Sequence, residues 1–186
     1  MQSQVGRQEW IVNNTIVDWI PNQTAIIVVD MWNVHWCPTA TTRVGKIAVP
    51  MNKTLYAARD LGIHIIFAPS DVTSFYKTDP ARLRTLALPT IQLPDSNKQQ
   101  VPTFPLGVNT DGGCDIAAPA SSPWTRQIAS LSIDHDRDYL IAADLPGNPN
   151  AGTHELFNII SHLGIKNLIY MGYVVYIKIF CHMLRH

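Results

Sequence analysis

An acid and a thiol each follow an apolar run that is predicted to be a strand, and the ends of strands are where a parallel sheet places reactive groups. Asp30 ends the continuous apolar run TAIIVVD at residues 24–30, and Cys181 ends the segment GYVVYIKIFC at residues 172–181. A carboxylate beside a cysteine can take the thiol proton as a general base and return it to a leaving group as a general acid. Asp30 and Cys181 are therefore the candidate catalytic residues, as proton shuttle and nucleophile.

Other polar and aromatic residues are predicted to line a substrate pocket around this pair. They are Trp32 and His35 in MWNVHWC, Asp71 after the apolar run IIFAPS, and Arg126 in PWTRQ. Asp30, His35 and Asp71 would also suit a metal-dependent hydrolase, but no D-x-H or H-x-x-x-H spacing accompanies them. We therefore expect neither a metal nor another cofactor. Simpler interpretations stay open. Asp30 and Asp71 can be ordinary turn residues, and the cysteines and aromatic residues can be part of the packed core.

The elements that would position these residues alternate between apolar strands and helices. A strand with two apolar faces belongs in a parallel sheet covered by helices, and Gly62 and Gly164 are placed to end helices in the left-handed C′ conformation before an incoming strand. Pro50 should kink or restart the first helix, and Thr153 is a plausible N-cap for the second. The predicted order is strand 24–30, helix 43–61, strand 63–69, a long irregular loop at 89–125, strand 138–143, helix 153–163 and strand 167–172.

Composition favours a single domain spanning residues 1–186, with its core at 24–181. Fourteen basic and fourteen acidic residues cancel, which argues against nucleic acid and membrane surfaces as partners. The sequence has no signal-peptide pattern and no apolar run of about 20 residues, so we expect a cytoplasmic protein. Three cysteines without C-x-x-C spacing favour reduced thiols.

Three stretches together carry a family resemblance: TAIIVVDMWNVHWC, GIHIIFAPSD and THELFNIISHLGIKNLIYMG. In this order they resemble the isochorismatase-like cysteine hydrolases, which include nicotinamidases and N-carbamoylsarcosine amidohydrolase. The resemblance spans about residues 24–172. It implies a three-layer α/β/α fold with a doubly wound, mainly parallel sheet, and an Asp, Lys and Cys triad that cleaves an amide, carbamoyl or related C–N bond of a small molecule through a thioester.

Asp30 matches the triad aspartate of this family, whereas the other two triad positions depart from the pattern. Eight residues separate Gly172 from Cys181, where the family has five, and AADLPGNPNAGT at residues 142–153 contains no lysine. Arg126 and Arg137 are the candidates to replace that cation, although a guanidinium differs from an ammonium in shape.

Two functional hypotheses follow from the match and its departures. In the first, Cys181 attacks, Asp30 shuttles the proton, and backbone N–H groups near residues 176–181 hold the oxyanion. In the second, the chain is an inactive or truncated relative that lacks the last elements of the fold and acts as a binding or oligomerisation module. An uncovered sheet edge would then favour a homo-oligomer.

Overall fold

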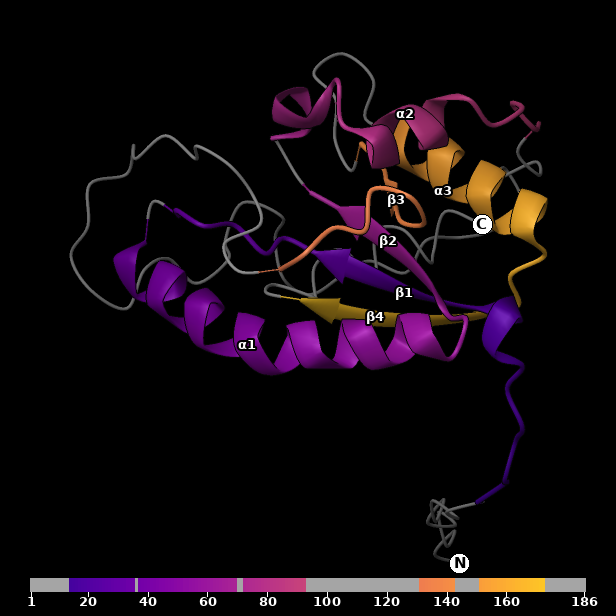
Figure 1. Ribbon diagram of the computed structural model, residues 1–186, viewed down its shortest axis with the longest axis horizontal. Helices are drawn as coiled ribbons and strands as arrows, with labels where there is room; N and C mark the ends of the chain where they lie inside the picture. The colour runs from indigo at the N-terminus through magenta and orange to yellow at the C-terminus, as the bar shows by residue number, and fades with distance from the viewer. Residues whose placement is uncertain (1–13, 36, 70–71, 93–130, 143–150, 173–186) are drawn as a thin grey trace, which may run out of the picture.

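The computed structural model describes residues 14–35, 37–69, 72–92, 131–142 and 151–172, which form an α/β fold (Figure 1). Its four strands are β1 (Thr24–Val29), β2 (His64–Ala68), β3 (Tyr139–Leu140) and β4 (Asn167–Gly172). All neighbouring strands are parallel, in the order β3-β2-β1-β4. The expected α/β class with a parallel sheet is confirmed.

Strand β1 is the centre of the sheet, and each of its six residues is buried. Successive side chains of a strand point to opposite faces, so β1 contributes to two cores. Ile26 and Val28 pack with residues of helix α1 (Pro38–Asp60), whereas Ala25, Ile27 and Val29 pack with residues of helix α3 (Ala151–Leu163). Helices therefore cover both faces of β1, which explains its continuous apolar run.

Helix α1 begins earlier than expected and runs through Pro50 without interruption. Cys37 is its N-cap residue and Pro38 its first residue, a position where the missing N–H of proline costs nothing. Pro50 cannot donate a hydrogen bond to the carbonyl of Lys46. The predicted restart at Pro50 does not occur. The loss is offset by the buried side chains of α1, which lie on one face of the helix: Val44, Ala48, Met51, Leu55 and Ala58.

Both glycine predictions at the helix ends are confirmed. Gly62 has φ +85° and Gly164 has φ +67°. After α1 the N–H of Ile63 donates to the carbonyl of Ala58, and that of Gly62 donates to Arg59, the two bonds of a Schellman motif. Thr153 is not the N-cap, because α3 already begins at Ala151.

Helix α2 (Pro80–Leu86) was not predicted from the sequence. Asp79 is its N-cap and accepts a hydrogen bond from the N–H of Ala81, and Pro80 is its first residue. The Asp-Pro pair is a helix-start signal, but seven residues are too short to show a clear apolar period. No helix among the described residues is long and apolar enough to cross a membrane.

Candidate active site

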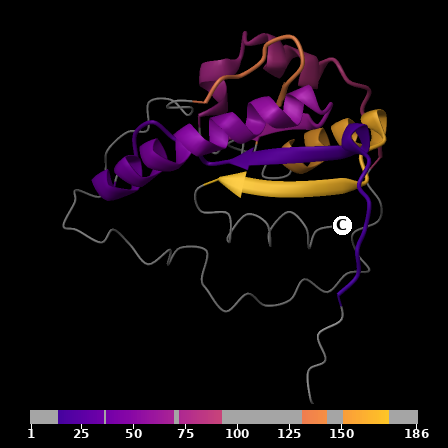
Figure 2. The ribbon, with the colours of Figure 1, turned by 60° about the horizontal axis from the view of Figure 1, so that its bottom comes forward.

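The strand order creates a switch point between β1 and β4. From β1 the chain proceeds outward to β2 and β3, and then returns to place β4 on the other side of β1. Figure 2 shows β1 and β4 side by side with their arrowheads at the same end. In open parallel sheets, ligands bind outside the carboxyl ends of strands at such a point. Asp30 and Gly172 lie there, as the first residue after β1 and the last of β4.

Asp30 occupies this position with an unusual backbone and a buried side chain. Its φ is +53°, and it is the only described non-glycine residue with a positive φ; its exposed fraction is 1%. The left-handed conformation costs an L-residue about 1–2 kcal/mol, although aspartate tolerates it better than most residues. A buried carboxylate held in such a conformation at a ligand-binding edge is typical of a functional residue.

Gly172 makes a close approach to the end of β1. Its φ is +149°, and it is the register partner of Val29. A Cβ atom at this position would lie 1.9 Å from the carbonyl oxygen of Val29, far inside any van der Waals contact. Only glycine therefore allows the carboxyl end of β4 to lie this close to the residue that precedes Asp30.

Trp32 and His35 lie in the segment that leads from Asp30 to α1. Trp32 is 4% exposed and belongs to the core cluster on the α1 side of the sheet. The ring of half-buried His35 lies 5.5 Å from that of Trp32, centroid to centroid. His35 Nδ1 accepts a hydrogen bond from the Cys37 N–H at 3.0 Å, so in the neutral ring the proton is on Nε2.

Helix α1 begins directly after this segment, at the same end of the sheet as the carboxyl ends of β1 and β4 (Figure 1). The N–H of His35 donates to Thr41 Oγ1 at 2.9 Å, which ties the segment to the first turn of the helix. The positive end of the α1 dipole thus lies at the edge that carries Asp30.

Cys37, the N-cap residue, is buried and disulfide-bonded. The expectation of reduced thiols is therefore wrong for Cys37. It is the only cysteine among the described residues.

Three of the predicted site residues lie outside the described residues: Asp71, Arg126 and Cys181. Arg137, the other candidate cation, lies just before β3 and therefore at the opposite edge of the parallel sheet from Asp30. There it donates to Asp134 Oδ2 at 2.8 Å. Arg137 cannot replace the triad lysine, because the amino and carboxyl ends of parallel strands are separated by the length of the strands.

A buried cation at the carboxyl end of β3 was not predicted from the sequence. Arg82 of α2 is 5% exposed and donates two hydrogen bonds to Glu155 of α3, at 2.5 and 2.8 Å. Arg82 also donates to the carbonyl of Leu140, and Glu155 accepts the N–H of Ala142. The ion pair joins α2, α3 and β3. Because Glu155 neutralises Arg82, we assign a structural role to Arg82.

Among the described residues, no group of three or more histidine, cysteine, aspartate and glutamate side chains is placed to hold a metal ion. Comparison with known proteins found no matching family model and no matching curated protein. The sequence motifs and the geometry at the carboxyl ends of β1 and β4 are therefore the features that indicate a function.

Proposed function

We propose that this protein is an isochorismatase-like hydrolase with the three-layer fold of that family, and that it cleaves an amide, carbamoyl or related C–N bond of a small molecule. The single observation that carries the proposal is Asp30, a buried carboxylate in a left-handed conformation. It lies at the switch point of a parallel sheet, in the motif that matches the triad aspartate.

In the proposed reaction, Asp30 takes the proton of the Cys181 thiol as the sulfur attacks the substrate carbonyl carbon. The tetrahedral intermediate collapses, the C–N bond breaks, and Asp30 gives the proton to the leaving nitrogen. Water then attacks the thioester, with Asp30 as general base, and releases the acid and the thiol. Backbone N–H groups near residues 176–181 would hold the oxyanion; their role rests on the sequence alone.

The test is single-turnover mass spectrometry of the intact protein with a panel of small amides and carbamoyl compounds. Thiol reductant is present throughout, because Cys37 is disulfide-bonded. We expect a covalent adduct on Cys181 whose mass equals the acyl part of the substrate. Cys181→Ala should abolish the adduct, whereas Cys114→Ala should retain it. An adduct that survives Cys181→Ala, or no adduct with any compound, would rule against the proposal.

A second candidate function is an inactive module that binds a further copy of itself. The observation in its favour is β4, whose six residues are all only partly buried and which pairs only with β1 among the described strands. An exposed strand edge is a template for pairing with another chain. Sedimentation distinguishes a monomer from a dimer that is paired through β4. A Tyr170→Lys variant should be more monomeric than the wild-type protein, since a charge on β4 should weaken the pairing of two chains there.

A further inference from the structure

Residues 14–20, which precede the 3₁₀ turn η1 (Pro21–Gln23), form an arm that lies outside the packed layers. All of its residues are exposed, including four large apolar side chains: Ile16 at 96%, Val17 at 65%, Trp19 at 48% and Ile20 at 54%. Figures 1 and 2 both show the arm running from the amino end of β1 past β4 and away from the sheet. A contiguous group of exposed apolar side chains marks an interaction site.

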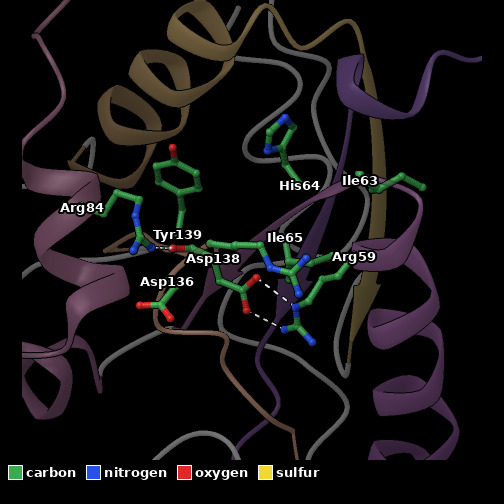
Figure 3. A pocket seen from close by; sticks show the side chains of 10 residues that line it. Arg59, Ile63, His64, Ile65, Arg84, Asp136, Asp138 and Tyr139 are labelled. Carbon is green, nitrogen blue, oxygen red and sulfur yellow. Dashed lines mark hydrogen bonds and ion pairs between the residues drawn. The ribbon is translucent and has the colours of Figure 1, made fainter.

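The arm starts from a fixed point at the amino end of the sheet. The carbonyl of Ile20 accepts hydrogen bonds from the N–H of Gln23 at 3.0 Å and from Thr24 Oγ1 at 2.9 Å. The carbonyl oxygen of Asn22 lies 3.3 Å from Nε2 of His64, the first residue of β2 (Figure 3). By contrast, the backbone of residues 14–19 makes no hydrogen bond to another described residue. Its donors and acceptors are therefore available to a partner.

The arm has the composition of a β-strand. Five of its seven residues are β-branched or aromatic, the types that are enriched in strands: Thr15, Ile16, Val17, Trp19 and Ile20. Ile20 already has the extended angles φ −82° and ψ 121°. Since side chains alternate along a strand, Val17 and Trp19 would lie on one face, and Ile16 and Ile20, with Asp18 between them, on the other. A strand with apolar residues on both faces suits a sheet that is covered on both faces.

Strand β4 is a matching acceptor for such a strand. It pairs with β1 on one side, and no described strand pairs with its other side. Its apolar side chains are only partly buried on both faces: Ile169 and Met171 on the α1 side, and Leu168 and Tyr170 on the α3 side. A further strand would pair the open backbone groups and cover both faces. Six residues of the arm and the six of β4 each span about 20 Å.

We propose that two copies of this chain exchange their arms, so that residues 15–20 of each copy add a strand to the open side of β4 in the other copy. The occupant is a second copy because the arm runs away from its own sheet in both views. A two-fold dimer uses both arms and both β4 edges at once, and strand addition gains affinity from main-chain hydrogen bonds. The exchange rests on the open β4 edge of the second candidate function, and it is independent of hydrolase activity.

The test is sedimentation equilibrium of the complete chain, with thiol reductant present so that disulfides between copies do not contribute. We expect a wild-type dimer. Val17→Lys should raise its dissociation constant by about tenfold or more, because an unpaired charge is costly to bury. Val49→Lys is the matched control: Val49 is 56% exposed on α1, and the same change there should alter the dissociation constant by less than about threefold.

Mixed chains identify the two elements that meet. Tyr170→Lys should also weaken the dimer, because β4 is the acceptor. A dimer of either variant alone has no intact contact between an arm and β4. A mixed dimer keeps one, between the arm of the Tyr170→Lys chain and β4 of the Val17→Lys chain, so mixing should restore a dimer at a concentration where neither variant dimerises. If Tyr170→Lys does not fold, Met171→Lys on the other face of β4 replaces it.

Several results would overturn the exchange: a monomeric wild-type chain, equal losses in Val17→Lys and Val49→Lys, or a mixture with no gain over the single variants. A dimer that survives Val17→Lys but not Tyr170→Lys would also overturn it, and would leave β4 paired with β4 as in the second candidate function. A dimer that survives Tyr170→Lys would exclude β4 as the acceptor. Hydrolase activity is measured separately, by the covalent adduct on Cys181, so its absence leaves the arm exchange unaffected.

Discussion

Each edge of the sheet holds a buried aspartate, and the two aspartates differ in their backbone conformation. At the amino end, Asp138 accepts bonds from Arg59 at 2.5 and 3.0 Å and one from the N–H of Asp134 at 2.7 Å, so its carboxylate is saturated. At the carboxyl end, Asp30 is equally buried but sits in a strained backbone conformation next to a close contact of two strands. Saturated charges hold a turn in place, whereas a strained, buried acid at a switch point suits chemistry.

The sharpest test of this contrast is Asp30→Asn. Asparagine keeps the shape and tolerates the left-handed conformation, so the free energy of unfolding should change by less than about 1 kcal/mol. Turnover of any substrate found in the amide panel should fall by about 10²–10⁴-fold, the usual contribution of a general acid–base group. Urea titration and steady-state kinetics measure the two effects. A large loss of stability with unchanged turnover would make Asp30 a structural residue.

At the opposite edge, Arg59→Met should have the opposite effect to Asp30→Asn, because it should lower stability. Removing one partner of a buried ion pair leaves an uncompensated charge, and should lower the free energy of unfolding by about 3–5 kcal/mol. The double variant Arg59→Met/Asp138→Leu should recover much of that loss, since both charges are then gone. Arg137→Gln, at an arginine that is 58% exposed, should leave the urea midpoint nearly unchanged. An Arg59→Met protein as stable as the wild type would contradict the assignment.

The contact between the ends of β1 and β4 is tested by Gly172→Ala. The added methyl group would collide with the carbonyl of Val29, and the backbone would have to leave its φ of +149°. We expect a loss of about 2–3 kcal/mol in the free energy of unfolding. Gly45→Ala is the matched control, because a Cβ there meets no atom within 4 Å; inside α1 it should stabilise by up to about 1 kcal/mol.

The smallest effect is expected from the pair of half-buried Asp134 and exposed Arg137 in the turn before β3. The hydrogen bond from Arg137 lowers the pKa of Asp134, although burial opposes the shift. A lowered pKa in the folded state contributes stability above the unfolded value of about 3.9, and this is lost as pH falls through the folded value. The difference between the melting temperatures of the wild-type protein and the Asp134→Asn variant should therefore become smaller below about pH 4. A difference that grows in acid would contradict this assignment.

Local patterns account for much of what was predicted correctly. The apolar runs at residues 24–29 and 64–68 indicate strands because both faces of each strand are buried, and Gly62 and Gly164 mark helix ends because a residue without a Cβ adopts a positive φ. Local patterns failed where packing between distant residues opposes a local preference. Pro50 does not break α1, because the packing of one helical face outweighs a missing hydrogen bond, and the short helix α2 depends on Arg82 and Glu155, which are 73 residues apart.

By itself, the sequence determined the α/β class, the succession of the main strands along the chain and the placement of Asp30 at a strand end, because these follow from local periodicity and chain order. Only the tertiary structure decided the strand order β3-β2-β1-β4, and with it the switch point that brings Gly172 beside the residue before Asp30. It also decided that Arg137 belongs to the far edge, and that Arg59 and Arg84 bind Asp138 from opposite sides (Figure 3). Contacts between distant residues depend on how the layers pack, and a single sequence does not encode that packing in any local pattern.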